Sequence, residues 1–146
     1  MSSVKSCIEK KFGQVFSLPS FAPVQLALEL MRNNRIRSVM VIDDGVLTGV
    51  VTQGDCAIKV LLPGLSARET PVSDIMTRSP MTVTMKESLQ QCMAIMTTRN
   101  FRHLPVVDNG RVVGMVSIGD IVKDIMSQQG DQIKQLETYI KGHGAP

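Results

Sequence analysis

The chain has few of the residues on which several common classes of binding protein rely. Its 146 residues include no Trp, one Tyr and four Phe, so an aromatic platform for stacking nucleic-acid bases is not expected. The formal net charge is only +3, and Lys and Arg are scattered instead of forming the basic stripe that is typical of nucleic-acid binding. The composition therefore argues against a nucleic-acid partner.

Cysteine is also scarce, and its spacing excludes two common uses. Cys7, Cys56 and Cys92 are an odd number of widely spaced residues without a C-x-x-C pair, which fits neither a disulfide framework nor a zinc site. No apolar run approaches the length needed to cross a bilayer, and the N-terminus lacks the apolar core of a signal peptide. We therefore expect a reduced, soluble, cytoplasmic protein that has no membrane contact.

What the chain does contain is an internal repeat, which must be read before any local pattern. The stretch Gly49-Val50-Val51-Thr52-Gln53-Gly54-Asp55 returns as Gly114-Met115-Val116-Ser117-Ile118-Gly119-Asp120. A shift of 65 positions aligns residues 20–61 with 85–126 without a gap and gives ten identities, where chance would give roughly two or three. In the first copy the identical residues are Gln25, Met31, Arg37, Val41, Asp43, Gly45, Gly49, Val51, Gly54 and Asp55.

Each copy has the periodicity of a strand, a helix, two strands and a second helix. Asp43-Asp44-Gly45 and Asp108-Asn109-Gly110 have the composition of hairpin turns between the last two strands. The elements expected of the first copy are a strand at 15–16, a helix at 24–34, strands at 36–42 and 46–51, and a helix at 53–62. Those expected of the second are a strand at 81–83, a helix from 88, and a strand at 101–107 in which Pro105 favours a sheet edge.

These elements predict an α/β (α+β) fold of two pseudo-symmetric repeats packed through their sheets, because each half is too short to bury a good core alone. We assign residues 1–68 to the first repeat with an N-terminal lead-in, and 69–128 to the second. Residues 129–146 are expected to be a C-terminal helix or tail. Its apolar residues at helical spacing, which would suit a docking helix, are Ile133, Leu136 and Ile140.

The repeated motif admits two interpretations. Thr52-x-x-Asp55 and Ser117-x-x-Asp120 both fit the capping box of a helix start, in which hydroxyl and carboxylate only satisfy free N–H groups. A helix N-terminus after a strand is also an anion site. There the hydroxyl could bind phosphate or ribose, and the carboxylate could accept ribose hydroxyls, as acidic residues do in dinucleotide sites.

Basic residues at matching positions favour the second interpretation. Arg37 and Arg102 occupy the same place in the two copies, and His103 follows Arg102. Guanidinium groups are suited to bidentate contacts with phosphate. Taken singly, each could equally be a solvated charge or a satisfied histidine. Because motif and basic residue recur in register, we favour a pair of nucleotide sites.

The sequence resembles a tandem pair of cystathionine-β-synthase (CBS) domains over residues 8–126. The resemblance rests on Asp74-Ile75-Met76-Thr77, on Arg102-His103-Leu104-Pro105-Val106-Val107-Asp108, and on both Gly-to-Asp motifs. It implies two clefts between the sheets of the halves that bind adenosyl ligands: AMP, ADP, ATP, NAD or, favoured least, S-adenosylmethionine. The tail and linker resemble stand-alone CBS-pair proteins, which are typically homodimers.

The resemblance also implies roles for individual residues. Ribose hydroxyls are expected at Asp55 and Asp120, and ribose or phosphate at Thr52 and Ser117. Phosphate is expected at Arg37, Arg102 and His103. The residues expected to line the adenine are Ser17, Met81, Thr82 and Val83, with Val51 and Val116 as apolar walls. Ser38 and Met40 replace the His103 and Pro105 positions in the first copy, so weaker phosphate binding is expected there.

The predicted function is non-catalytic binding and sensing of an adenine nucleotide, signalled through the shape of a homodimer. The sequence contains no P-loop, no G-x-G-x-x-G and no metal-ligand cluster, so we do not expect an enzyme. The alternative is a protein-interaction or redox-linked regulatory partner with vestigial nucleotide sites. In either case a regulated protein partner is possible.

Overall fold

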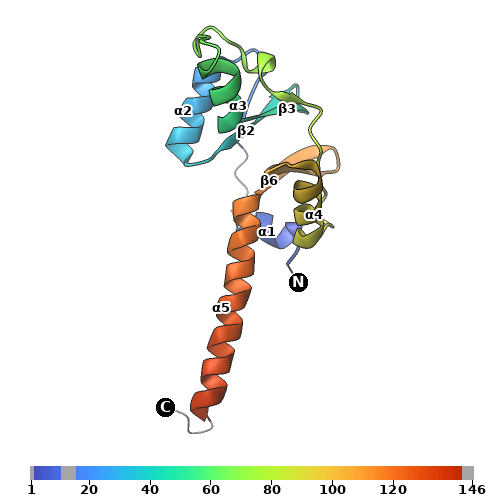
Figure 1. Ribbon diagram of the computed structural model, residues 1–146. Coiled ribbons are helices and arrows are strands. Elements are labelled where there is room, and N and C mark those ends of the chain that lie inside the picture. The colour runs from blue at the N-terminus through green and yellow to red at the C-terminus, as the bar shows by residue number, and fades with distance from the viewer. Residues whose placement is uncertain (1, 11–15, 143–146) are drawn as a thin grey trace.

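The computed structural model describes residues 2–10 and 16–142. Two α/β lobes lie one above the other in Figure 1, and a long helix projects from the lower lobe. The upper lobe contains the first repeat and the lower lobe contains the second. The expected fold class, with two strand–helix–strand–strand–helix units facing each other through their sheets, is confirmed in outline.

The first lobe is built on a four-stranded sheet in the order β1-β2-β3-β4. The strand β1 is parallel to β2, and the other neighbours are antiparallel. The predicted helix at 53–62 begins as expected but becomes a π-helical turn from Ala57. The elements are β1 (Ser17–Leu18), α2 (Val24–Asn34), β2 (Ser38–Asp43), β3 (Val46–Thr52), α3 (Gln53–Cys56), η1 (Ala57–Leu61), η2 (Val72–Asp74) and β4 (Thr77–Arg78).

The second lobe repeats this arrangement with fewer strands. Its helix α4 (Leu89–Arg99) precedes the antiparallel pair β5 (His103–Asp108) and β6 (Arg111–Ser117), and α5 (Ile118–Gly142) follows. Both predicted hairpin turns are confirmed. Asp44 and Gly45 have φ of 50° and 79°, and Asn109 and Gly110 have 51° and 78°, the left-handed pair that a two-residue hairpin turn requires.

The predicted strand at Met81–Val83 is corrected to a single bridge between Val83 and Val106. In the first lobe the N–H of Met40 donates to the carbonyl of Phe16 (3.2 Å) and extends the parallel pairing. Pro105 occupies the equivalent position and has no N–H to donate. Only the bonds around Val83 remain, from its N–H to Pro105 O (3.0 Å) and from Val107 N–H to its carbonyl (2.9 Å). Pro105 thus lies on the weakly paired side of β5, as its sequence predicted.

Each lobe is completed by the segment that precedes the other repeat. Helix α1 (Val4–Lys10) places Val4 and Ile8 in the core of the second lobe. In return, Val72, Ile75 and Met76 belong to the core of the first. The N-terminal lead-in, assigned to the first repeat from sequence, therefore packs with the second, and the boundary drawn at 68/69 separates the first repeat from part of its core.

Two glycines of the repeated motif allow this exchange. A Cβ atom on Gly114 of β6 would lie 2.6 Å from Cδ1 of Ile8, and one on Gly49 of β3 would lie 2.5 Å from Sδ of Met76. These separations are far inside van der Waals contact. Gly49 and Gly114 are therefore the positions at which each lead-in segment packs directly on a strand, β3 in the first lobe and β6 in the second.

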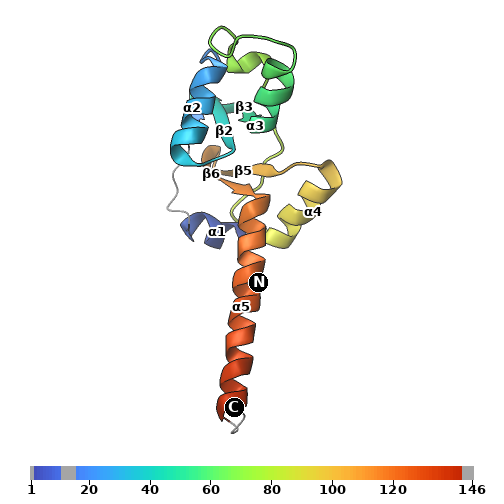
Figure 2. The ribbon, with the colours of Figure 1, turned by 60° about the vertical axis from the view of Figure 1, so that its left-hand side comes forward.

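Helix α5 runs without a break from Ile118 to Gly142, so the boundary expected at 128/129 falls inside one helix. Its distal half stands clear of both lobes in two views (Figures 1 and 2). Near its start, Val122 and Met126 are 48% and 64% exposed. The side chains of Ile133, Leu136 and Ile140 lie outside the described residues. In the described part of the chain, no helix has both the length and the apolar character that crossing a bilayer requires.

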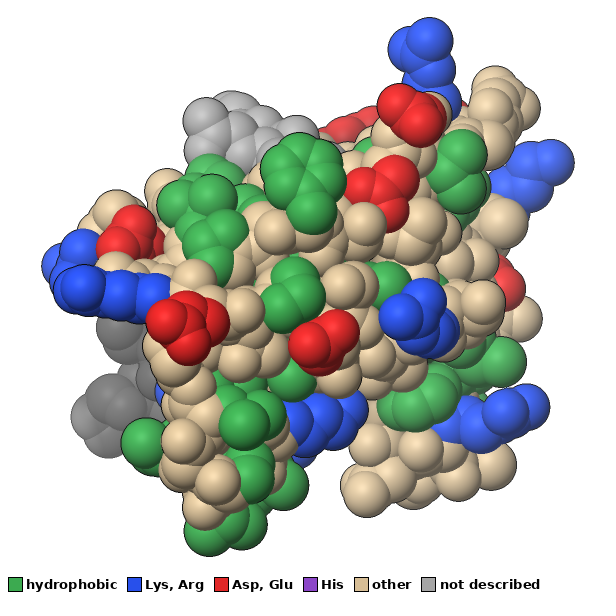
Figure 3. Space-filling view, turned by 90° about the horizontal axis from the view of Figure 1, so that it is seen from above, with side chains coloured by type: hydrophobic (Ala, Val, Ile, Leu, Met, Phe, Trp, Pro, Cys, Tyr) green, Lys and Arg blue, Asp and Glu red, His purple; other side chains and the backbone are tan. Residues whose placement is uncertain are grey.

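The end of the first lobe carries apolar side chains on its surface. Figure 3, which looks down onto the molecule from above, shows them between acidic and basic groups. The most exposed large apolar residues of this lobe are Phe21, Leu61 and Leu62, at 79%, 78% and 76%. This surface is one of the places at which another molecule could pack.

Candidate functional site

The first copy of the repeated motif forms a complete capping box. Thr52 is the N-cap of α3, and its Oγ1 accepts the N–H of Asp55 (3.1 Å). The Asp55 Oδ2 accepts the N–H of Thr52 in return (2.9 Å). The other carboxylate oxygen of Asp55 lies 3.2 Å from Nζ of Lys59, one helical turn further on.

The second copy has the same geometry at the start of α5. The Oδ2 of Asp120 accepts the N–H of Ser117 (2.7 Å), and Ser117 Oγ accepts the N–H of Asp120 (3.2 Å). The two side chains also lie within hydrogen-bond distance of each other, Oγ to Oδ2 at 2.9 Å. The capping interpretation of the motif is therefore confirmed as geometry in both copies, and it leaves the second carboxylate oxygen of each aspartate outside the box.

Backbone bonds tie both arginines to these helix starts. The carbonyl of Arg37 accepts the N–H of Gln53 (3.0 Å), and the carbonyl of Arg102 accepts that of Ile118 (2.9 Å). At the next residue, Gly54 and Gly119 have only ordinary contacts where a Cβ would be, 3.6 Å from the cap hydroxyl. Each helix start thus presents a hydroxyl, a carboxylate, an arginine and an approachable glycine backbone.

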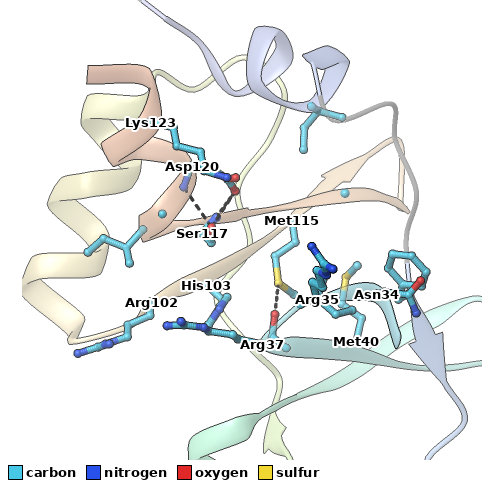
Figure 4. A pocket seen from close by; sticks show the side chains of 17 residues that line it. Asn34, Arg35, Arg37, Met40, Arg102, His103, Met115, Ser117, Asp120 and Lys123 are labelled. Carbon is cyan, nitrogen blue, oxygen red and sulfur yellow. Dashed lines mark hydrogen bonds between the residues drawn. The ribbon is translucent and has the colours of Figure 1, made fainter. Parts of the chain in front are cut away.

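The Ser117 and Asp120 motif opens onto a cavity of about 740 Å³ between the lobes (Figure 4). Its walls combine this motif with Arg37, Ser38 and Met40 of the first lobe. The Oγ of Ser38 donates to Sδ of Met115 across the cavity floor (2.9 Å), which joins the two sheets. In Figure 4, His103 and Arg37 project into the space between the facing strands, and Lys123 points toward Asp120. We call this cavity cleft A.

The Thr52 and Asp55 motif opens onto a related cavity of about 490 Å³, which we call cleft B. Here the motif comes from the first lobe, and Met81, Phe101 and His103 come from the second. Both volumes fall within the range of small-molecule sites, roughly 300–1,000 Å³. Each cleft therefore lies between the repeated motif of one lobe and the residues around the start of the other repeat, Phe16 in cleft A and Met81 in cleft B.

Eight of the residues predicted for the sites line a cleft. Cleft A is lined by Arg37, Arg102, His103, Ser117 and Asp120. Cleft B is lined by Arg37, Thr52, Asp55, Met81, Arg102 and His103. The three basic residues thus line both clefts. Weaker phosphate binding was expected beside Thr52 and Asp55, but cleft B shares Arg102 and His103 with cleft A.

The placement expected of the remaining five residues is corrected. Val51 and Val116 are fully buried in the two lobe cores, and Val83 is 1% exposed. Side chains alternate across a strand, so the neighbours Val50 and Met115 line the clefts instead. Ser17 and Thr82 are exposed outside both clefts.

Sequence reasoning missed several lining residues. Phe16 and Ile36 line cleft A, and Phe101 lines cleft B. The repeat contains a signal for all three, because a shift of 65 positions places Ile36 on Phe101, and Phe16 on the predicted site residue Met81. Lys123 also lines cleft A. It has no basic equivalent in the first copy, where Ile58 stands at its position.

Arg37 and Arg102, the two arginines that line both clefts, are uncompensated cations. Both are exposed, and among the described residues neither guanidinium group forms an ion pair. An unpaired guanidinium beside a helix N-terminus creates a positive potential for anions. Together with His103, these two side chains make the wall between the clefts suited to phosphate.

The cysteines do not take part in the clefts. Cys56 and Cys92 are buried, and burial raises the pKa of each thiol to about 11. At neutral pH both are protonated thiols and poor nucleophiles. Within the described part of the chain, no group of three His, Cys, Asp or Glu side chains is placed to hold a metal ion.

Comparison with known proteins places this fold and site in a family. The family model for the CBS domain matches the chain twice, at residues 8–61 and 72–127. The mitochondrial CBS domain-containing protein CBSX3 of Arabidopsis thaliana is 32% identical over 121 residues, which cover 80% of this chain. The chain spans 59% of the length of that relative.

Two solved structures of similar proteins agree with the fold. A protein with CBS domains from Burkholderia ambifaria is 34% identical, with a TM-score of 0.83 over 88% of this chain and 96% of its own. The CBS domain pair of protein MJ0100 is 26% identical, with a TM-score of 0.77 over 88% and 98%. That pair was solved in complex with 5′-methylthioadenosine and S-adenosyl-L-methionine. The chain therefore belongs to the CBS-domain family and carries two CBS domains in tandem.

Proposed function

We propose that the protein is a non-catalytic sensor that binds an adenine nucleotide in clefts A and B. The observation that carries this proposal is the repeated combination of a hydroxyl–carboxylate pair, an approachable glycine backbone and uncompensated arginines around a cavity of ligand size. The adenosyl ligands in the complex of the MJ0100 pair support the same class of ligand. AMP, ADP, ATP and NAD are the candidates, with S-adenosylmethionine favoured least.

The clefts suggest how such a ligand would be oriented. The oxygens of Asp55 and Asp120 outside the capping bonds would accept ribose hydroxyls. At Asp55 the ribose would displace the ammonium group of Lys59, which lies 3.2 Å from that oxygen. Phosphate would lie toward Arg37 and Arg102, because guanidinium binds it in bidentate fashion. The adenine would pack on the apolar wall of each cleft, at Phe16 and Ile36 or at Met81 and Phe101.

Signalling would require that the ligand bind one arrangement of the protein more tightly than another. We propose a homodimer as the responding assembly. The exposed apolar residues Val122, Ile125 and Met126 near the start of α5 support an association surface. Cytoplasmic localisation stays a prediction, and one relative is named as mitochondrial.

Isothermal titration with AMP, ATP, NAD and S-adenosylmethionine tests the proposal. We expect heat of binding from at least one of them at protein concentrations of ~100 μM, a choice suited to weak sites. Ribose 5-phosphate and pyrophosphate are the controls, since both carry phosphate that can bind arginine and neither contains adenine. Equal binding of these controls, or no heat from any adenosine compound, would contradict the proposal.

The second candidate function is protein interaction, and the projecting half of α5 favours it (Figure 2). Deleting residues 130–146 separates the two candidates. Loss of partner binding with unchanged nucleotide affinity would favour protein interaction through α5 as the function. If the shortened protein keeps both partner binding and nucleotide binding, sensing through the clefts is the better explanation.

A further inference from the structure

The side chain of Lys59 links cleft B to the segment that connects the two lobes. Its Nζ lies 3.2 Å from Oδ1 of Asp55, the carboxylate oxygen outside the capping box. The same ammonium group donates to the backbone carbonyl of Ile75 at 2.9 Å. Ile75 directly follows η2 and precedes β4, where Thr77 lines cleft B. One lysine therefore bonds both the cleft and the connection between the repeats.

The position of Lys59 makes it a competitor of any ligand that uses Asp55. The lysine side chain is 46% exposed, whereas that of Asp55 is 15% exposed. A half-exposed ammonium group returns to water at little cost, because exposed ion pairs are weak. The carboxylate itself stays in place, because its Oδ2 accepts the N–H of Thr52 (2.9 Å) within the capping box. A ribose that takes Oδ1 would therefore move the lysine and not the aspartate.

The turn that carries Lys59 differs from its counterpart in the second repeat. Residues Ala57–Leu61 form a π-helical turn, a feature that recurs at functional sites inside helices. Helix α5 is α-helical over the equivalent residues. The residue at the position of Lys59 is Asp124 there, which has the wrong charge to bond the carboxylate of Asp120. This link to the connecting segment therefore belongs to the first repeat.

We propose that Lys59 is a latch between cleft B and the connecting segment, residues 72–78. In the empty protein it holds the Asp55 carboxylate and the Ile75 carbonyl together. A ligand whose hydroxyl groups take that carboxylate frees the lysine and loosens the connecting segment, whereas a ligand in cleft A leaves the latch closed. The latch rests on the proposed function. It adds the two arrangements between which a ligand must discriminate if its binding is to be signalled.

Affinity measurements test the competition. The variant Asp120→Ala, which is expected to lose binding in cleft A, isolates cleft B, and Lys59→Met is added to it. The probes are AMP, ATP, NAD and S-adenosylmethionine, each of which carries the adenosine ribose. Without the latch the ribose has no ammonium group to displace, so the probe that binds should do so about two- to ten-fold more tightly.

The sign of this change separates a latch from simple charge attraction. A lysine that only attracts phosphate predicts weaker binding of AMP, ATP and NAD when it is removed. Equal or weaker binding in the double variant would therefore overturn the latch. Lys86→Met is the matched control, because Lys86 is an exposed lysine of the second lobe that lines neither cleft. It should leave the affinity unchanged.

Hydrogen exchange, measured by mass spectrometry, tests the release of the connecting segment. This segment is held on the first lobe by backbone bonds from the N–H of Val72 to the carbonyl of Ala22 (2.8 Å) and from that of Ser73 to Ser20 (3.1 Å). Peptides covering residues 72–78 should exchange about two- to ten-fold faster in ligand-free Lys59→Met than in the parent protein. The bound probe should produce the same increase in the parent and no further increase in Lys59→Met.

The cleft that controls the segment is identified by Asp120→Ala. This variant should keep the response of residues 72–78 to the probe, because cleft B is intact. A response that persists unchanged in Lys59→Met, or that disappears in Asp120→Ala, would overturn the latch and leave the proposed function standing. If none of the four probes binds the parent protein, the proposed function fails and the latch fails with it.

Discussion

The repeated aspartates carry a structural task that can be separated from ligand binding. Helix α4 begins with a capping box of the same kind, in which Gln91 Oε1 accepts the N–H of Ser88 (2.8 Å). That box lines neither cleft. Gln91→Ala and Asp120→Ala therefore remove equivalent capping bonds, and only the second removes a cleft residue.

We expect both variants to lower the free energy of unfolding by about 1 kcal/mol, and only Asp120→Ala to abolish nucleotide binding in cleft A. Urea denaturation measures the first effect and isothermal titration the second. A folded Asp120→Ala protein that binds nucleotide as the parent does would show that the carboxylate serves the helix alone.

The two buried cysteines predict a pH dependence of stability. Burial raises the pKa of Cys56 and Cys92 from an ordinary value of 9.0 to about 11. Since the folded pKa lies above the unfolded one, their contribution to stability is complete below pH 9 and is lost as the pH rises toward 11. Urea midpoints measured from pH 8 to 11 should fall, and should fall less steeply in a Cys56→Ala, Cys92→Ala double variant. An equal slope would assign the loss to lysine or tyrosine titration.

At the scale of elements, the sequence predicted local features well. Hairpin turns and helix caps depend on residues within four positions of one another, and both were found where expected. The side of the sheet toward which Val51 and Val116 point could not be predicted in this way. Their neighbours Val50 and Met115 are apolar too, so alternation does not reveal which face meets the core.

The short strand at Met81–Val83 shows a second limit of local reasoning. A strand forms only where its partner offers hydrogen bonds, and the partner here is Pro105, more than twenty positions away. Proline was correctly placed on the weakly paired side of its own strand. That proline also removes a backbone hydrogen bond from the neighbouring segment, residues 81–83, became clear only from the observed register.

Helix α5 carries the element-scale prediction for the proposed homodimer. Val122, Ile125 and Met126 lie at the i, i+3 and i+4 spacing of one helix face and are each more than a third exposed. If a second copy covers this face, Met126→Asp should raise the dimer dissociation constant at least about ten-fold, since an unpaired carboxylate resists burial. Sedimentation velocity over a concentration series measures the change. Ser127→Asp, one residue further round the helix, is the control and should not alter the assembly.

At the scale of the whole molecule, the exchange of lead-in segments makes a matched pair of predictions. Ile8 precedes the first repeat and is buried in the second lobe; Ile75 precedes the second repeat and is buried in the first. Ile8→Ala and Ile75→Ala should each cost about 2–5 kcal/mol of unfolding free energy. Hydrogen exchange should show protection lost first in α4, β5 and β6 for Ile8→Ala, and in α2, β2 and β3 for Ile75→Ala. Loss in the opposite lobes would contradict the exchange.

The sequence could not reveal this exchange or the shared wall of the clefts. The repeat predicted two similar sites, one for each copy, with Arg37 beside Thr52 and Arg102 beside Ser117. Which lobe a lead-in segment covers, and whether an arginine faces one cleft or both, depends on how the halves are oriented. No local pattern of residues records that orientation.

The glycine contacts of β3 and β6 have one more consequence. Each repeat is completed by the segment that precedes the other repeat. A chain with a single repeat would therefore have an uncovered last strand, equivalent to β3 or β6, and a lead-in segment with no strand to cover. Two such chains could satisfy each other only by trading these segments. The tandem protein therefore has the architecture of a domain-swapped dimer whose two subunits have been joined into one chain.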